Sequence, residues 1–127
     1  MSLFDLSGRV ALVSGAASGM GKAMSLALAE HGADLMLADL NTEGLEQTAE
    51  EIRSRGRRAV AVTCNVSHYG PIRELFQKLD AEYGRLDFLG NVAGEGLLAN
   101  PEEITLEQVE QVFQNLVFGR FCMCQEA

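Results

Sequence analysis

The sequence predicts an α/β fold in which helices cover both faces of a doubly wound parallel sheet of about four strands. Short, almost continuously apolar runs recur along the chain, as strands covered on both faces require. Each run is followed by a small-residue turn or polar loop and then by a helix-like stretch, so consecutive strands are joined by right-handed crossovers. The chain has 127 residues, which suits a single domain over residues 1–127.

The individual elements follow from local patterns. We expect strands at residues 9–14, 35–39, 59–63 and 86–89, and helices at about 20–31, 42–55 and 67–83. Asn41 is placed to cap the second helix, and Gly32 and Gly56 follow the first two helices as C-terminal stops. After a loop at 94–101, Thr105 and Gln108 form a capping box for a last helix that continues to Ala127.

Composition excludes several classes of function. Eighteen acidic and ten basic residues give a net charge of −8, which argues against a nucleic-acid partner. The sequence has no long uncharged apolar run for a membrane span and no secretory signal pattern at its start. Three cysteines without metal-like spacing predict free thiols and no metal site. These features together favour a cytoplasmic protein.

The first strand and the first helix are joined by a glycine-rich turn, Ser-Gly-Ala-Ala-Ser-Gly-Met-Gly at residues 14–21. Gly15, Gly19 and Gly21 would allow a tight turn, close packing of the helix, and close approach of the backbone to a pyrophosphate. The helix N-terminus would also offer unpaired N–H groups to the phosphates. Glycine also serves ordinary turns, so these three residues alone leave a purely structural role open.

Asp39 adds a second observation, because it ends the second strand about 20 residues beyond Gly19. An acid at this place in a dinucleotide-binding, Rossmann-type sheet accepts hydrogen bonds from the adenosine ribose hydroxyls. It would also repel a 2′-phosphate, and no arginine or lysine lies in the turn or beside Asp39. We therefore predict NAD rather than NADP, with a surface aspartate at a strand end as the alternative.

Taken together, these motifs make the sequence resemble the classical short-chain dehydrogenase/reductase family. Residues 14–21 are similar to its Thr-Gly-x-x-x-Gly-x-Gly motif, residues 64–66 to its Asp-Val step with asparagine for aspartate, and residues 91–94 to its Asn-Asn-Ala-Gly motif. The resemblance implies an NAD-dependent oxidoreductase that interconverts an alcohol and a carbonyl by hydride transfer. It also implies a set of cofactor-binding residues: Gly15, Ser18, Gly19, Met20, Gly21, Asp39, Leu40, Cys64, Asn65, Val66, Asn91, Ala93 and Gly94.

The family's catalytic residues, an Asn, a Ser and Tyr-x-x-x-Lys, are not matched. Four residues after Tyr69 and Tyr83 stand Arg73 and Asp87, not lysine. The expected asparagine falls on Leu116, and its neighbour Asn115 would serve only if a local bulge corrected the register, because one residue rotates a side chain by about 100° on a helix. We expect the missing groups beyond Ala127. The alternative is a catalytically silent nucleotide-binding or oligomerising module.

The expected partners are a small alcohol or carbonyl substrate and further copies of the chain. Glu95 could face that substrate, although a plain loop acid is the simpler interpretation. The last helix carries more apolar residues than one sheet-covering face can hide, and the resemblance implies that this helix packs against its copy in a homodimer or homotetramer. These residues are Val109, Val112, Phe113, Leu116, Phe118 and Phe121.

Overall fold

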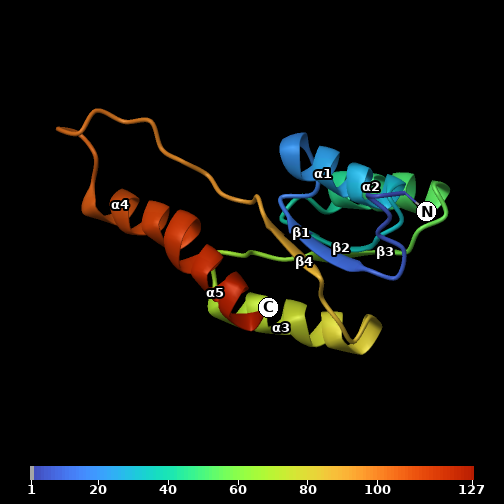
Figure 1. The fold of residues 1–127 in the computed structure, drawn as a ribbon. Helices are drawn as coiled ribbons and strands as arrows, with labels where there is room; N and C mark the ends of the chain where they lie inside the picture. Colours follow the sequence, from blue (N-terminus) through green and yellow to red (C-terminus); the bar gives the residue numbers. More distant parts are fainter. Residues whose placement is uncertain (1) are drawn as a thin grey trace.

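The computed structural model describes residues 2–127, and its elements follow the predicted alternation of strands and helices (Figure 1). The strands are β1 (Val10–Ser14), β2 (Asp34–Asp39), β3 (Ala59–Thr63) and β4 (Phe88–Asn91). The helices are α1 (Gly19–Glu30), α2 (Thr42–Ser54), α3 (Tyr69–Glu82), α4 (Leu106–Phe113) and α5 (Gly119–Glu126), with a π-helix, η1 (Gln114–Phe118), between the last two.

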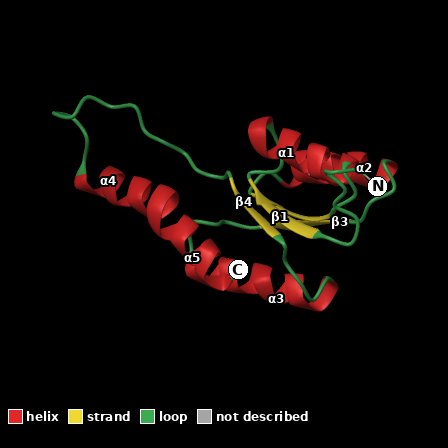
Figure 2. Cartoon of the chain, in the orientation of Figure 1, coloured by secondary structure: helices red, strands yellow, loops and turns green. Residues whose placement is uncertain are grey.

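The four strands form one parallel sheet in the order β3-β2-β1-β4. Helices α1 and α2 cover one face, while α3 and α5 lie against the other, which gives three layers (Figure 2). The predicted doubly wound fold is therefore confirmed. Because β1 leads to β2 on one side and pairs with β4 on the other, the strand order reverses beside β1, where such sheets bind ligands at the carboxyl ends of the strands.

Strand β2 has a continuously apolar sequence because both of its faces are covered by helices. Leu35 and Leu37 pack beneath α1 and α2, and Met36 and Ala38 point to the opposite face toward α3. This alternation is the ordinary period of a strand, but here both faces are covered. All four side chains are fully buried, so β2 lies at the centre of both cores.

Strand β4 begins two residues later than predicted, at Phe88 instead of Leu86. The Asp87 carboxylate accepts a hydrogen bond from the backbone N–H of Val10 (2.9 Å) and pairs with Arg85 and Arg9. The chain therefore enters the sheet only after Asp87. It stays paired with β1 as far as Asn91, although glycine and asparagine are uncommon in strands.

The last helix starts at its predicted capping box, since Thr105 and Gln108 make both reciprocal hydrogen bonds. The segment stays helical as far as Glu126, as predicted, but the π-helix η1 interrupts its α-helical course. A π-helical turn accommodates an extra residue and so changes the register of all that follows. At its end Gly119 is buried against the Val66 carbonyl, where any side chain would overlap that oxygen.

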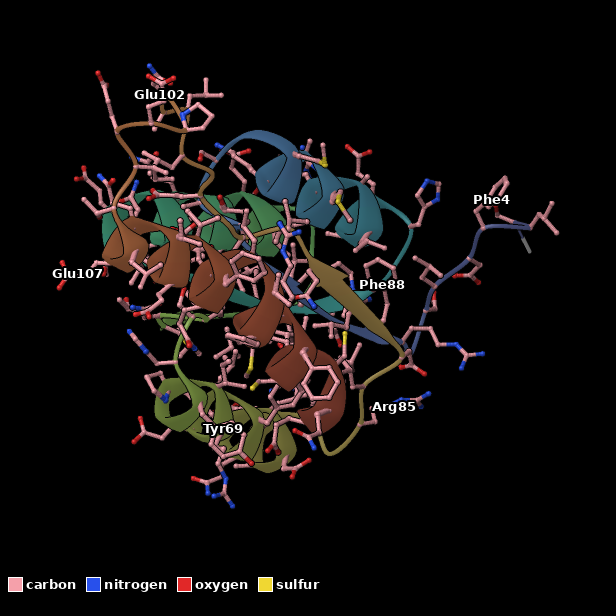
Figure 3. The ribbon with its side chains drawn as sticks, turned by 90° about the vertical axis from the view of Figure 1, so that its left-hand side faces the viewer. Phe4, Tyr69, Arg85, Phe88, Glu102 and Glu107 are labelled. Carbon is pink, nitrogen blue, oxygen red and sulfur yellow. The ribbon has the colours of Figure 1, made fainter. Side chains whose placement is uncertain are left out.

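The surface of this last helical segment is unusually apolar. In Figure 3 the segment runs across the side nearest the viewer, with Phe88 on β4 to its right and Glu107 projecting at the far left. Phe113 and Phe121 on the segment are 50% and 66% exposed, and Phe88 is 43% exposed. Among residues 2–127, no helix is both long enough and apolar enough to span a membrane.

Candidate functional site

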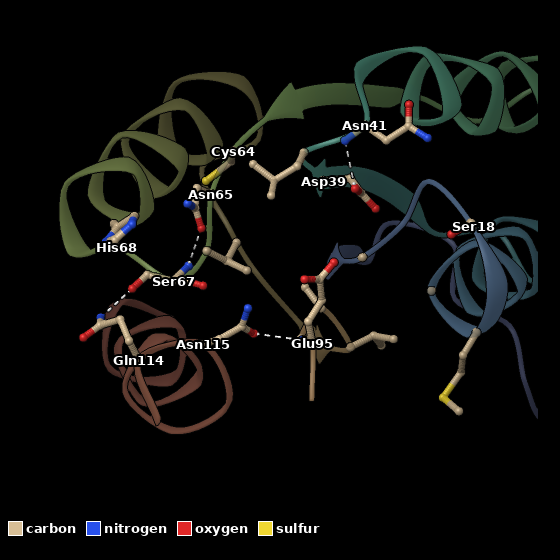
Figure 4. Close-up of a pocket in the computed structure, with 18 of the residues that line it drawn as sticks. Ser18, Asp39, Asn41, Cys64, Asn65, Ser67, His68, Glu95, Gln114 and Asn115 are labelled. Atoms are coloured by element: carbon tan, nitrogen blue, oxygen red, sulfur yellow. Dashed lines mark hydrogen bonds between the residues drawn. The ribbon is translucent and has the colours of Figure 1, made fainter. Parts of the chain in front are cut away.

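A cavity of about 650 Å³ opens at the carboxyl ends of the strands (Figure 4). Its walls come from the segments that follow each of the four strands and from the helical segment 111–115. Two of the predicted cofactor-binding residues, Gly19 and Asn91, lie outside its lining. The others all line it, namely Gly15, Ser18, Met20, Gly21, Asp39, Leu40, Cys64, Asn65, Val66, Ala93 and Gly94.

A different local feature explains the glycine at each of the three positions in the turn. Gly15 has a φ of +69°, and a side chain there would come within 2.9 Å of the Ala93 nitrogen. A side chain at Gly21 would overlap the Gly15 carbonyl, so Gly21 lets α1 pack against the turn. Gly19 has a φ of +56° and faces open space. The turn therefore presents bare backbone at the cavity mouth, as the sequence predicts.

The N-terminus of α1 remains open toward this space. Ser18 is the N-cap residue, yet its side chain caps no N–H group of the described chain, and no acid occupies the first turn. The first N–H groups of a helix and the positive end of its dipole form a site for an anion. Lys22, the basic residue next to the turn, instead pairs with Glu51 at 2.9 Å.

Asp39 joins the turn to the end of β2. One carboxylate oxygen accepts a hydrogen bond from the Ala17 N–H and the other from the Asn41 N–H, each at 3.0 Å. A carboxylate has about four acceptor positions, so both oxygens can still accept from a ligand hydroxyl. Within the described chain, no lysine or arginine lines the cavity to offset this charge.

Two polar side chains, the buried Ser14 and the half-buried Asn91, hold the segment after β4. The Ser14 hydroxyl accepts hydrogen bonds from the backbone N–H groups of Val92 (3.1 Å) and Ala93 (3.0 Å). Asn91 donates its side-chain amide to the Arg120 carbonyl at 3.0 Å and thereby ties β4 to α5. Its Oδ1 is buried without a partner among the described residues. Asn91 therefore supports the cavity wall, although the residue itself lies outside the lining.

The segment after β3 supplies Cys64 and Asn65. Asn65 Oδ1 accepts a hydrogen bond from the Ser67 N–H at 3.0 Å, which closes a local turn. Cys64 is buried beneath it, and this burial raises the pKa of its thiol to about 11. A thiol with a pKa raised in this way stays protonated near pH 7, which argues against a role as a nucleophile. In the part of the chain described, no cluster of three or more His, Cys, Asp or Glu could hold a metal ion.

The bulge that Asn115 would need is present, because η1 spans Gln114–Phe118. Asn115 lines the cavity, and its Oδ1 accepts a hydrogen bond from the Glu95 N–H at 3.1 Å. Leu116 instead lies against Gly94, where its side chain would meet any added Cβ. The π-helix thus brings the neighbouring asparagine, rather than the residue at the expected position, into the site.

Neither tyrosine lies in the cavity. The Tyr69 hydroxyl donates to Glu126 at 3.1 Å, and the Tyr83 hydroxyl donates to the Leu35 carbonyl at 2.8 Å. Burial raises the pKa of Tyr83 to about 12, so this phenol stays protonated and structural.

Sequence reasoning missed several residues of the cavity wall. Most of them adjoin a predicted motif, and the spacing of Gln111 and Gln114 relative to Asn115 places all three on one helix face, which was an available signal. Glu95, for which a plain loop acid was the simpler interpretation, also lines the cavity. The residues missed are Asn41, Ser67, His68, Val92, Gln111 and Gln114.

Comparison with known proteins decides the family. The family model described as short chain dehydrogenase matches residues 9–127. The chain belongs to the short-chain dehydrogenase family. Its relatives include the D-threitol dehydrogenase of Mycolicibacterium smegmatis, which is 38% identical over 96% of this chain and 47% of its own length. The chain spans about half the length of the curated relatives that it matches.

Solved short-chain dehydrogenases share the fold. A short-chain type dehydrogenase/reductase from Mycobacterium marinum aligns with a TM-score of 0.94 and 33% identity, covering 100% of this chain and 53% of that protein. An NAD⁺-bound xylitol dehydrogenase aligns with a TM-score of 0.90 and 30% identity, covering 95% and 47%. The chain therefore has the fold of a family of oxidoreductases, one of which was solved with NAD⁺ bound.

Proposed function

We propose that this protein is an NAD-dependent oxidoreductase that interconverts an alcohol and a carbonyl compound by hydride transfer. The main support for the proposal is that the open glycine turn and the Asp39 carboxylate lie next to each other at the mouth of the cavity. The turn suits a pyrophosphate, and the carboxylate suits two ribose hydroxyls but not a 2′-phosphate. A relative named as a D-threitol dehydrogenase and a neighbour solved with NAD⁺ support the same conclusion.

The residues present fit such a dinucleotide. The bare backbone at Gly19 and the uncapped α1 N-terminus would hold its phosphates, and Asp39 would hold its adenosine ribose. Leu40 and Asn65 would border the base, while the segment around Gly94 would border the nicotinamide ribose. Bound NAD supplies the carbon that accepts or delivers the hydride, and the protein orients it.

Hydride transfer also needs a proton donor or acceptor matched to the reaction. Tyr69 and Tyr83 are both engaged elsewhere, so we propose that the family's tyrosine and lysine lie outside residues 1–127. Asn115 is then our candidate for the family's catalytic asparagine. The second candidate function, a catalytically silent nucleotide-binding module, rests on the absence of Tyr-x-x-x-Lys from this sequence. Steady NADH production from an alcohol by a verified 127-residue chain would contradict this division of roles.

The remaining proposals concern substrate, assembly and compartment. The names of the D-threitol and xylitol dehydrogenases favour a small polyol, and the polar side chains of Glu95, Gln111 and Gln114 in the cavity suit one. The exposed phenylalanines of the last helical segment favour a homodimer or homotetramer. The free thiols of all three cysteines favour the cytoplasm.

Calorimetric titration with NAD⁺ and NADP⁺ tests the cofactor assignment. We expect the chain to prefer NAD⁺ by about tenfold or more, because Asp39 opposes the 2′-phosphate. Asp39→Asn removes the charge and should narrow this preference. Asp80→Asn, an equal change of charge on the exposed surface of α3, serves as the control and should leave the preference unchanged. Equal or tighter binding of NADP⁺ by the unmodified chain would overturn the assignment.

A further inference from the structure

We propose that Asn65 determines base specificity by presenting an N–H donor to the purine, so that the cavity binds a 6-oxopurine dinucleotide at least as tightly as NAD. This inference rests on the proposed dinucleotide-binding function. It concerns only the hydrogen-bonding edge of the base. The proposed binding of the phosphates and of the ribose does not depend on it.

The orientation of the Asn65 amide is fixed by its neighbour. The backbone N–H of Ser67 can only donate, so the side-chain atom 3.0 Å from it must be the oxygen of Asn65. Figure 4 shows this hydrogen bond on the wall of the cavity. The amide Nδ2 is consequently the remaining polar atom of the side chain.

That nitrogen is free to meet a ligand. It makes no hydrogen bond to any residue from 2 to 127, and it is not among the buried unpartnered atoms of this part of the chain. Asn65, Leu40 and Val66 all line the cavity, and the two apolar side chains offer surface for the face of a flat base. The neighbouring Cys64 thiol approaches the Pro71 carbonyl at 3.6 Å and is kept neutral by burial, so it adds no charge there.

The chemistry of the purine edge then sets the preference. Adenine carries an amino group at C6, which is a donor, and N1, which is an acceptor. Hypoxanthine carries a carbonyl oxygen at C6, which is an acceptor. An amide N–H can donate to adenine N1 or to the hypoxanthine oxygen, but it cannot accept from the adenine amino group. Hypoxanthine also carries N1–H, which is a donor. A carboxylate at the same place would accept from the adenine amino group, whereas beside hypoxanthine it would accept only from N1–H and would be repelled by the neighbouring carbonyl oxygen.

The test compares NAD⁺ with nicotinamide hypoxanthine dinucleotide by calorimetric titration of the chain. We expect the hypoxanthine form to bind as tightly as NAD⁺ or more tightly. Asn65→Asp keeps an oxygen for the Ser67 N–H but removes the donor, so it should shift the ratio of the two affinities toward NAD⁺ by about tenfold.

Asn100→Asp is the matched control. Asn100 lies outside the cavity lining and, like Asn65, accepts a hydrogen bond from the backbone N–H two residues further on (Glu102, 3.3 Å), so this variant adds the same charge without touching the base site. Its affinity ratio should equal that of the unmodified chain. Tight NAD⁺ binding with rejection of the hypoxanthine form, or an unchanged ratio in Asn65→Asp, would overturn the inference and leave the proposed function intact. Failure of both dinucleotides to bind would overturn the proposed function itself.

Discussion

Two regions of the chain, residues 9–91 and residues 94–127, differ in how much of their apolar surface is buried. In the first region most large apolar side chains are buried or half-buried. Of the exposed ones, Met20 and Leu40 line the cavity, while Tyr69 and Phe88 do not. In the second region Met123 is the buried large apolar residue. Its exposed counterparts are Leu97, Leu98, Leu106, Phe113, Val117, Phe118 and Phe121. The first region is packed against itself, whereas the second presents a surface that a partner would cover.

The two regions meet at the cavity, and a few contacts hold them together. Met123 is fully buried against the face that carries α3, and the Arg120 carbonyl accepts the Asn91 amide. Glu126 accepts the Tyr69 hydroxyl at the end of α5. We infer that the part of the proposed dinucleotide site for the phosphates and the adenosine depends on the first region, while the part beside Gly94 and Asn115 depends on how the last helical segment is held.

The largest expected effect comes from breaking the first region at Gly21. Gly21→Ala places a methyl group on the Gly15 carbonyl, so α1 must move away from the turn. We predict a loss of about 1–3 kcal/mol in the free energy of unfolding, measured with urea, together with loss of NAD⁺ binding.

Gly70→Ala is the control for this prediction. Gly70 lies in α3 and has open space where a side chain would stand, so its replacement should be neutral or stabilise the helix by about 0.5–1 kcal/mol. If Gly21→Ala and Gly70→Ala lost the same free energy of unfolding, the predicted role of the close packing at Gly21 would be contradicted.

Phe121→Glu tests whether the second region is covered by another copy. Phe121 is 66% exposed in the single chain, and burial of a large apolar side chain contributes roughly 1.5–3 kcal/mol. We predict that light scattering finds a dimer or tetramer at micromolar concentration and that the variant dissociates. Phe4→Glu, at an equally exposed phenylalanine (66%) outside residues 94–127, should leave the size unchanged. If light scattering found the unsubstituted protein to be a monomer, the proposed interface would be refuted.

The smallest expected effect lies at Asp87, which anchors the start of β4 to β1. Hydrogen bonds from Arg85 and then from the Val10 N–H lower the pKa of Asp87 to about 2. A lowered pKa stabilises the folded state above the unfolded value near 4, and this stabilisation is lost as pH falls toward 2. The urea midpoint of the protein should therefore fall over this range more steeply than that of Asp87→Asn. Parallel pH profiles would contradict the assignment.

The sequence predicts most of the first region because its signals are local. Apolar runs mark the strands, and Gly15 and Asp39 come together because the carboxyl ends of parallel strands share one edge. The start of β4 could not be predicted, since it depends on a hydrogen bond between Asp87 and Val10, 77 positions apart. The π-helix likewise depends on tertiary packing, in which Gly119 lies against the turn after β3. From the sequence, Asn115 could therefore be placed in the site only on the condition that a bulge interrupts the helix.

The central claim is that NAD binds across the ends of the strands, with its phosphates at the α1 N-terminus. Titration of NAD⁺ into the ¹⁵N-labelled chain, followed by the backbone amide resonances, tests it directly. We predict the largest changes at Gly19, Met20 and Gly21, with smaller ones at Asn65 and Ala93. Saturable binding that leaves the amides of the glycine turn unchanged would contradict the account, as would the absence of any binding.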